Sequence, residues 1–370
     1  MNKNKIKNNN YKFCLVVIKL LVVFILGKFF YETDYNLKYI KLIQPYKRIG
    51  VLCYTNDNNI GNNLVKFSMY TLLKSYGFHP TMIAPSDPYN LYFLKNKMKY
   101  KEIKSNFNEI KENDYDILMV NSDQTWRYNF EYLLDIGFLN FAQNWSIPKF
   151  TYGVSLAVDS WDVSKTFLDK AKILVKKFSA ISVREQNSVK IIQNNLGIEP
   201  IFVLDPTFLI NKNIYLELIK DFKLNINLNQ SYICVYKLDP NKIIEDFIND
   251  VAIKFNYKIL YIDRFKENYV EKFLFIFNIS KAIITDSYHG TVFSIIFNKP
   301  FISFINSFRG KDRFFSLAET FNLKNRFIFP TNSNIIDLNL LKTNPNINQT
   351  EFNALKEKSL NYIKKNLGMK

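Results

Sequence analysis

The fold is decided by the stretch TDSYHGTVFSIIFNKP, residues 285–300. The apolar, β-branched run at 281–284 comes directly before it and is too short for a helix, so it predicts a buried strand. Apolar residues then recur at helical spacing until Lys299 and Pro300 stop them. The small polar residues between strand and helix, Ser287 among them, sit where an N-cap belongs. Unpaired amides and the helix dipole at such a turn predict an anion site at the carboxyl edge of a sheet.

One of the two histidines of the chain, His289, falls in the first turn of this predicted helix, beside Gly290. An imidazole at that place can donate to a phosphate or carboxylate, or carry a proton to or from a bound substrate. The other interpretation is a capping turn whose ring faces solvent. The pattern by itself leaves both open.

The same alternation of short apolar runs and helical patterns extends from residue 48 to residue 305, which predicts an α/β architecture. In a parallel sheet the carboxyl ends of the strands lie at one edge, where ligands bind. Each polar strand end is typical of a turn when taken singly, but several at one edge predict a site. The expected strands are 48–54, 81–84, 116–120, 150–156, 180–183, 201–205, 232–236, 258–262, 281–284 and 301–305, and the polar ends include Ser122, Asp123, Gln124, Ser155, Arg184 and Asp205.

A polar turn at 55–63 contains Gly61, Asn62 and Asn63 and precedes a helical pattern that ends at Gly77. Such a strand-to-helix turn again directs backbone donors at a ligand. It carries neither GxGxxG nor GxxxxGK[ST], so nothing indicates a dinucleotide or P-loop site. Further helices are expected at 242–255, 270–279 and 351–367, and the basic segment with Arg309, Lys311 and Arg313 is expected to be a turn.

At 370 residues the chain is long enough for two domains, and a break in periodicity at 211–230 places the boundary there. The predicted domains are 48–225 and 226–370, with the C-terminal helix packing across both.

Residues 1–47 form a basic leader with an apolar run at 13–30. As a helix this run would span about 27 Å, compared with roughly 30 Å for the hydrocarbon core of a membrane. A membrane anchor is therefore expected. A docked or interfacial helix is the alternative, and a cleaved signal peptide is disfavoured because no small-residue cleavage site follows.

Much of the net charge of +17 lies in this leader, since the residues up to Arg48 include ten basic and two acidic side chains. A basic leader beside an apolar run favours a membrane surface and not nucleic acid as partner.

The chain has three cysteines, without a CxxC pair, and only two histidines. This composition argues against a disulfide framework, structural zinc and a histidine-rich metal centre. The composition does not exclude a Mg²⁺ ion bound by carboxylates, but the sequence contains no motif for one.

Six motifs in order resemble the polysaccharide pyruvyl transferase family. The resemblance implies two Rossmann-like domains similar to GT-B glycosyltransferases, with the active site in the interdomain cleft. It further implies transfer of the enolpyruvyl unit of phosphoenolpyruvate to a sugar, usually as a ketal, with release of phosphate and no cofactor. The motifs are NIGNNL at 59–64, NSDQTW at 121–126, YGVS at 152–155, ISVRE at 181–185, LDPT at 204–207 and TDSYHGT at 285–291.

The resemblance implies that Arg184 and His289 lie around the phosphoenolpyruvate. An arginine fork suits its carboxylate or phosphate, and His289 can donate the proton to the methylene carbon or hold the departing phosphate, aided by the amides of Gly290 and Thr291. Asp123 or Asp205 is the expected base. For both aspartates turn-capping is the alternative, and for Arg184 it is a salt bridge to Glu185. The expected substrate contacts are Asn62, Asn63, Ser122, Gln124, Ser155, Ser287, Gly290 and Thr291.

Two other functions compete with this one. A GT-B glycosyltransferase would place the diphosphate of a nucleotide sugar at the same helix N-terminus, and a catalytically idle, membrane-attached scaffold would need no donor at all. Since phosphoenolpyruvate is cytosolic, the catalytic domain is expected on the cytoplasmic side of a membrane, near glycan or lipid-linked sugar acceptors.

Overall fold

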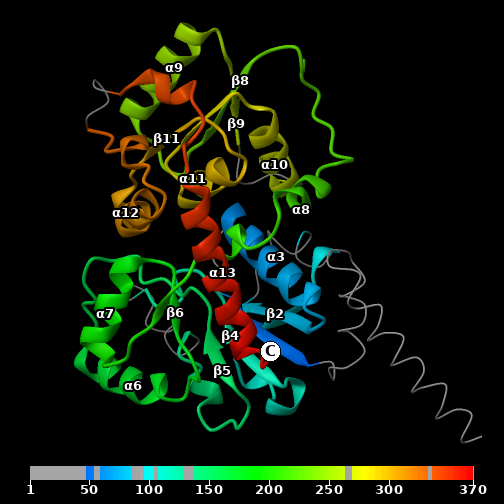
Figure 1. Cartoon of the computed structure of the whole chain (residues 1–370), viewed down its shortest axis with the longest axis vertical. Helices are drawn as coiled ribbons and strands as arrows, with labels where there is room; N and C mark the ends of the chain where they lie inside the picture. The colour runs from blue at the N-terminus through cyan, green and yellow to red at the C-terminus, as the bar shows by residue number, and fades with distance from the viewer. Residues whose placement is uncertain are drawn as a thin grey trace, which may run out of the picture. The chain divides into compact units, whose positions relative to one another are not determined.

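A computed structural model of the chain describes residues 47–53, 59–85, 93, 96–103, 107–127, 137–262, 269–331 and 336–369, all within one compact unit, Lys47–Lys370 (Figure 1). The predicted leader helix at 13–30 lies outside the described residues. Within the described ranges, no helix has the length and apolar character needed to cross a membrane. Below, 48–225 is called the first half and 226–370 the second half; the boundary between them stays a prediction.

The first half is built on a parallel sheet with strand order β3-β2-β1-β4-β5. Strands β1 and β4 are buried apart from Arg48 at the start of β1, because both faces of the sheet are covered, as in other parallel sheets. A short pair, β6 and β7, extends it through single bridges from Phe150 to Ala180 and from Val154 to Val183. The elements are β1 (Arg48–Leu52), α3 (Ile60–Ser75), β2 (His79–Pro85), β3 (Tyr100–Ile103), β4 (Ile117–Val120), β5 (Lys149–Thr151), α6 (Lys165–Val175), β6 (Ser182–Val183), α7 (Gln186–Leu196), β7 (Ile201–Phe202), the 3-10 turn η4 (Pro206–Phe208) and α8 (Lys212–Glu217).

The second half repeats the plan with a parallel sheet of order β12-β11-β10-β8-β9. Its core is rich in phenylalanine, with Phe273 and Phe293 in edge-to-face contact at 5.4 Å. The elements are β8 (Tyr232–Tyr236), α9 (Lys242–Phe255), β9 (Lys258–Tyr261), α10 (Tyr269–Ile279), β10 (Ala282–Thr285), α11 (Tyr288–Ile296), β11 (Phe301–Phe304), α12 (Lys311–Thr320), β12 (Phe327–Ile328) and α13 (Gln349–Asn366).

The two strand orders determine where ligands belong. In the first sheet the order reverses between β1 and β4, and in the second between β8 and β10. Open α/β sheets bind ligands outside the carboxyl ends of the strands at such switch points. The residues that follow these four strands, together with the starts of α3 and α11, are therefore the first place to look for a site.

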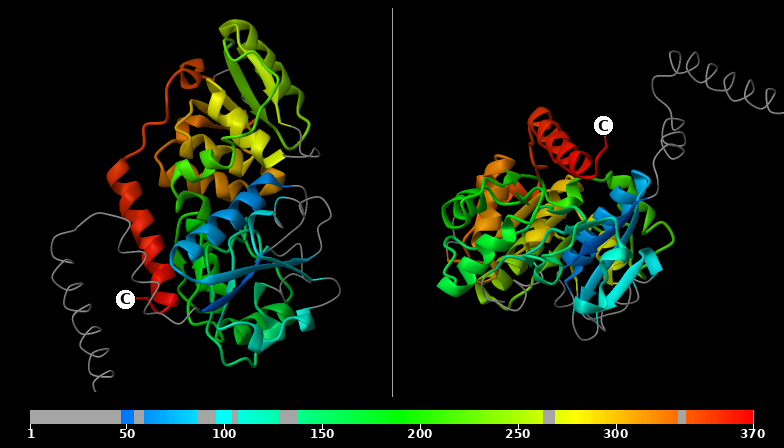
Figure 2. Two further views of the ribbon diagram at one scale, coloured as in Figure 1. Left: turned by 90° about the vertical axis from the view of Figure 1, so that its right-hand side faces the viewer. Right: turned by 90° about the horizontal axis from the view of Figure 1, so that it is seen from below.

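The C-terminal helix α13 contacts both halves (Figure 2). The hydroxyl of Tyr362 donates to the carbonyl of Thr151 on β5 at 2.9 Å, and the hydroxyl of Ser359 accepts from the amide of Leu204 at 3.0 Å. One turn after its start, Phe352 packs against Phe321 of the second half with ring centroids 5.8 Å apart. The helix thus ties the strand ends of the first half to the second half.

The structure corrects several expected boundaries. The residues Gly61, Asn62 and Asn63 were predicted to form a turn but lie in the first turn of α3, because Asn59 caps that helix by accepting from the Gly61 amide at 2.9 Å. Lys311 and Arg313, also expected in a turn, begin α12. The strand expected at 150–156 ends at Thr151, the one at 201–205 ends at Phe202, and the short strands β3 and β12 were not predicted.

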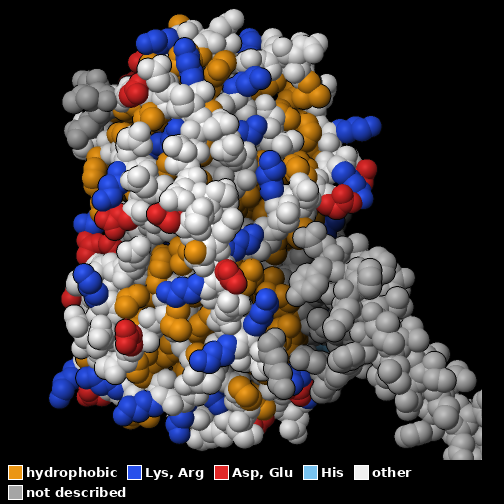
Figure 3. All heavy atoms as spheres, in the orientation of Figure 1, with side chains coloured by type: hydrophobic (Ala, Val, Ile, Leu, Met, Phe, Trp, Pro, Cys, Tyr) orange, Lys and Arg blue, Asp and Glu red, His pale blue; other side chains and the backbone are white. Residues whose placement is uncertain are grey.

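Basic side chains do not gather in one stripe on the face shown in Figure 3. Lysines and arginines are spread over it, with acidic side chains between them and apolar groups across the lower part. A nucleic-acid surface uses a continuous basic patch or stripe. This face shows no such patch.

Candidate active site

A guanidinium surrounded by three carboxylates lies at the carboxyl ends of the first-half strands. Arg184, directly after β6, donates from Nη1 to Asp205 Oδ2 at 2.7 Å, from Nη2 to Asp123 Oδ1 at 3.1 Å and from Nε to Glu185 Oε1 at 3.2 Å. Nη1 also reaches Ser122 Oγ at 3.2 Å. The side chain of Arg184 is fully buried. The salt bridge to Glu185 that the sequence suggested as an alternative is thus present, within a larger cluster that joins the ends of β4, β6 and β7.

Burial and charge act in opposite directions on the ionisation of this cluster. Burial would lower the pKa of Arg184, but the Tyr288 hydroxyl and the carboxylates outweigh it and raise that pKa. Burial would raise the pKa of Asp205, yet His289 and Arg184 hold it well below its usual range. For Glu185 burial prevails and raises the pKa, although Arg184 opposes the shift. Asp205 is therefore the firmly ionised member of the cluster.

The imidazole of His289 comes from the second half and meets the same carboxylate. His289 lies on α11 and is 3% exposed, and its Nε2 is 3.7 Å from Asp205 Oδ2. Among the described residues Nε2 has no hydrogen-bond partner. A separation of this kind in the absence of substrate is usual for catalytic groups, whose hydrogen bonds tighten when substrate binds. Arg184 and His289, which lie 105 positions apart in the sequence, thus share one oxygen of Asp205.

Asp205 also caps a turn, as the alternative interpretation expected. Its Oδ1 accepts from the amide and the hydroxyl of Thr207, at 3.0 Å and 2.7 Å, at the start of η4. The two oxygens of the carboxylate therefore have different tasks. Oδ1 holds the turn, and Oδ2 faces Arg184 and His289.

The amides at the start of α11 have partners within their own turn. The Gly290 amide donates to Ser287 Oγ at 3.3 Å, and the Thr291 amide donates to the Ser287 carbonyl at 2.9 Å. The Thr291 hydroxyl pairs with Ser303 at 2.6 Å. In this structure the amides of Gly290 and Thr291 therefore stabilise the cap, and an anion would reach them only if the cap opened.

Gly290 has a steric role instead. A Cβ at this position would lie 2.1 Å from Thr285 Oγ1, so only glycine lets α11 pack this closely on the end of β10. Beside it, Asp286 accepts from the amides of Leu238 at 2.6 Å and Asp239 at 3.2 Å. Asp286 thereby joins the ends of β8 and β10 at the switch point of the second sheet and fixes the backbone that carries His289.

The other residues predicted to contact the substrate lie either close to the Arg184 cluster or at its edge. Ser155 is fully buried with its hydroxyl near Glu185, and Asn62 is buried in the first turn of α3. Asn63 donates to the Tyr269 hydroxyl on α10, across the two halves. Gln124 is only partly buried and accepts from Arg127 at 2.5 Å. The strand ends and the α3 start are thus brought together, with Gln124 at their edge.

Gly61 makes the contact that the sequence analysis missed. A Cβ added to Gly61 would lie 2.0 Å from Nδ1 and 2.2 Å from Cγ of His289. The imidazole therefore rests directly on the backbone at the start of α3. The sequence placed the glycine of the first motif in a turn that directs backbone donors at a ligand, but in the structure it provides the space for the histidine of the last motif.

We expect Gly61→Ala to destabilise the protein even though alanine is the better helix former by roughly 1 kcal/mol. The new methyl group must displace the His289 ring or the start of α3, and such overpacking typically costs about 1–3 kcal/mol. Urea unfolding checks this, with Lys74→Ala on the exposed face of α3 as control. An alanine variant that is more stable than wild type would contradict the contact.

Two further residues at the site were not singled out as functional from sequence. Tyr288 is buried, and the guanidinium carbon of Arg184 lies 4.8 Å from the centroid of its ring. Arg313 of α12 approaches the same ring at 5.1 Å. The only available sign in the sequence was that Tyr288 precedes His289 in the motif.

The site does not have the composition of a metal centre. In the part of the chain that the structure describes, His, Cys, Asp and Glu side chains form no group of three or more placed to hold a metal ion. The three carboxylates of the cluster converge on the guanidinium of Arg184 instead.

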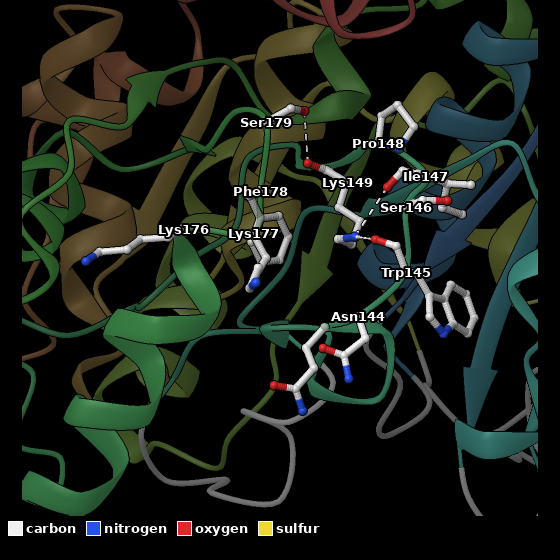
Figure 4. Close-up of a pocket in the computed structure, with 11 residues that line it drawn as sticks. Asn144, Trp145, Ser146, Ile147, Pro148, Lys149, Lys176, Lys177, Phe178 and Ser179 are labelled. Carbon is white, nitrogen blue, oxygen red and sulfur yellow. Dashed lines mark hydrogen bonds between the residues drawn. The ribbon is translucent and has the colours of Figure 1, made fainter.

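A pocket of about 530 Å³ lies at the other end of the first sheet, where Lys149 begins β5 (Figure 4). The Lys149 ammonium donates to the carbonyls of Trp145 at 2.6 Å and Ile147 at 3.3 Å, so its charge is directed at the backbone. None of the predicted site residues lines this pocket. Its lining consists of residues 143–149 and 176–179.

Comparison with known proteins settles the family. A family model described as polysaccharide pyruvyl transferase matches residues 59–307, a range that contains the Arg184 cluster and His289. The chain belongs to this family. The protein is accordingly a transferase, and the resemblance drawn from the six motifs is confirmed. Among curated proteins, none matches the sequence significantly.

Solved structures resemble the transferase in fold. S. aureus MnaA in complex with UDP has a TM-score of 0.55 at 14% identity, covering 88% of this chain and 98% of that one. UDP-GlcNAc 2-epimerase from Methanocaldococcus jannaschii has a TM-score of 0.51 at 14% identity, with 86% and 99% covered. A glycosyltransferase from Rickettsia africae has a TM-score of 0.51 at 12% identity, with 88% and 99% covered. These likenesses confirm the predicted fold of two Rossmann-like halves similar to GT-B.

Proposed function

We propose that this transferase moves the enolpyruvyl unit of phosphoenolpyruvate onto hydroxyls of a saccharide and releases phosphate. The family supports pyruvyl transfer to a polysaccharide. The observation that carries the choice of chemistry is the meeting of His289 Nε2 and Arg184 at Asp205 Oδ2. It places an imidazole, which can carry a proton, beside a carboxylate whose pKa is held low.

The reaction divides between His289 and the carboxylates. The proton on Nε2 passes to the methylene carbon of the donor, leaving an oxocarbenium-like centre at the neighbouring carbon. A saccharide hydroxyl adds to that carbon and loses its proton. The carbon–oxygen bond to the phosphate then breaks, and phosphate leaves with the electron pair. A second hydroxyl of the acceptor attacks the same carbon and loses its proton, which closes the ketal.

Each attacking hydroxyl must lose its proton to a base. A carboxylate whose pKa is held low is a weak base, so we assign Asp205 to orienting His289. Asp123 is the proposed acceptor of the hydroxyl proton. Arg184 fixes both carboxylates in place and stabilises the negative charge between them. Asn62, Asn63, Ser122, Gln124 and Ser155 are the proposed substrate contacts.

Phosphate release tests this function. With phosphoenolpyruvate and a panel of lipid-linked or aryl saccharides, we expect acceptor-dependent release of phosphate and a saccharide heavier by one pyruvyl group. The measurement is a coupled phosphate assay with mass spectrometry of the product. UDP-sugars serve as control donors and should give no transfer. Transfer of a sugar from UDP, with no reaction of phosphoenolpyruvate, would refute the proposal.

We further propose that the catalytic part works at the cytoplasmic side of a membrane, next to lipid-linked acceptors. Two features of the sequence support this, the basic leader and its apolar run at 13–30, and the cytosolic supply of phosphoenolpyruvate agrees with it. Protease protection in intact cells checks the sidedness. A catalytic part that is digested from outside the cell would overturn this placement.

A further inference from the structure

Arg313 is a buried arginine that forms no ion pair with a carboxylate of the described residues. It lies in the first turn of α12, six positions beyond the residues that the family model matches, and is 6% exposed. Its Nη2 donates to the carbonyl of Arg309, and its Nε has no hydrogen-bond partner among the described residues. No ion pair joins it to a described residue. A buried guanidinium with an unused donor is unusual, because burying a charge is unfavourable unless it is paired.

The other buried arginines of the molecule are satisfied within the protein. Arg184 directs its donors at Ser122 and three carboxylates. Arg326, also in the second half, donates to four carbonyls, those of Phe301, Leu340, Thr343 and Asn344, at 2.6 to 3.1 Å. Arg313 differs from both. Its Nε has no hydrogen-bond partner among the described residues and is left for a ligand.

The charge around Arg313 shows that it remains a cation. Burial lowers its pKa to about 10, with Arg184 acting in the same direction and Asp123 and Glu185 opposing the shift. It is therefore protonated at neutral pH. Its guanidinium carbon lies 5.1 Å from the centroid of the Tyr288 ring, the same ring that Arg184 approaches at 4.8 Å. The aromatic contact holds the cation next to the residue that precedes His289.

Binding of phosphoenolpyruvate, the proposed donor substrate, requires a cation near its charged groups. Phosphoenolpyruvate carries a phosphate and a carboxylate, whereas the single charge of Arg184 is already matched by three carboxylates. An anionic substrate approaching only that cluster would meet excess negative charge. A free guanidinium fork binds either oxyanion in bidentate form.

We propose that Arg313 binds an anionic group of the donor, and that Arg184 acts as the positioning residue for the carboxylates. This inference rests on the proposed function, because it takes phosphoenolpyruvate as the donor. It adds a residue from α12 to the active site. It also gives the two arginines at Tyr288 separate tasks, one toward the substrate and one toward the protein.

The test compares Arg313→Gln and Arg313→Lys with the wild-type protein. For the glutamine variant we expect the Kd for phosphoenolpyruvate, measured by calorimetry, to rise about 10- to 100-fold, the effect of losing a hydrogen bond to a charged group. The lysine variant keeps the charge but not the fork, so its Kd should rise less. Thermal protection by inorganic phosphate and by pyruvate then tells which end of the donor Arg313 holds, because only one of the two should lose its effect.

Arg326→Gln is the matched control, since it removes a buried arginine that donates to backbone carbonyls and to the Thr343 hydroxyl. It should lower the melting temperature and leave the Kd unchanged. If Arg313→Gln does not fold, Arg313→Lys decides alone, and an unchanged Kd in either folded variant overturns the inference. Failure of the proposed function looks different: wild type would not bind phosphoenolpyruvate, while loss of phosphate or pyruvate protection in the variants would still support an anion site at Arg313.

Discussion

Replacing Arg184 with methionine should destabilise the folded protein by about 3–5 kcal/mol, the usual effect of removing one partner from a buried ionic cluster. Asp123, Glu185 and Asp205 would remain buried without their common counter-ion. Urea unfolding followed by circular dichroism measures the loss. Phosphate release should fall as well, because the carboxylates would no longer hold their places beside His289.

Two further variants separate this effect from a general loss of packing. Arg48→Met removes an arginine that pairs with Asp116 at the exposed start of β1, and it should change stability little. Adding Asp205→Asn to Arg184→Met removes one of the uncompensated charges and should recover part of the lost stability. A single Arg184→Met variant as stable as wild type would show that the cluster is not ionised as described.

Replacing His289 with glutamine should lower the rate of phosphate release by about 10²- to 10⁴-fold, the range typical for loss of a general acid or base. Folding should be little affected, because Nε2 has no hydrogen-bond partner among the described residues whose loss would destabilise the protein. The rate is measured with saturating phosphoenolpyruvate and acceptor, so that a change in affinity does not hide a change in the chemical step.

His79→Gln is the matched control for this variant. His79 is the other histidine of the chain and lies exposed at the start of β2, at the amino edge of the sheet and away from the site. It should keep full activity. Normal turnover by His289→Gln would remove the imidazole from the mechanism, and the proton would then have to come from another group such as Glu185, whose pKa burial raises.

Together, the Arg184→Met and His289→Gln experiments distinguish the contribution to stability from the contribution to catalysis among the contacts of Asp205. Arg184→Met is expected to reduce both stability and activity, whereas His289→Gln is expected to reduce activity alone. The difference follows from the contacts: Arg184 donates to Asp205 at 2.7 Å as part of a closed ionic cluster, while His289 stands 3.7 Å from the same oxygen.

Local pattern was enough to predict most of the architecture. Helix α9 runs from Lys242 to Phe255 as expected, and the turn that carries His289 lies between a buried strand and a helix capped by Ser287. Apolar runs and caps are properties of a few neighbouring residues, so the sequence alone reveals them. The same holds for the polar strand ends, because parallel strands place all of them at one edge.

What the sequence by itself determined is therefore the order of strands and helices, the family and the set of residues at the strand ends. Only the tertiary structure decided that Arg184 is enclosed by three carboxylates and that Gly61 supports the imidazole of His289. It also decided that the Nε of Arg313, beside Tyr288, has no hydrogen-bond partner in the described part of the chain. The physical reason is distance along the chain. Gly61 and His289 are separated by 228 positions, and a contact of this kind depends on the packing of two sheets, which no local pattern records.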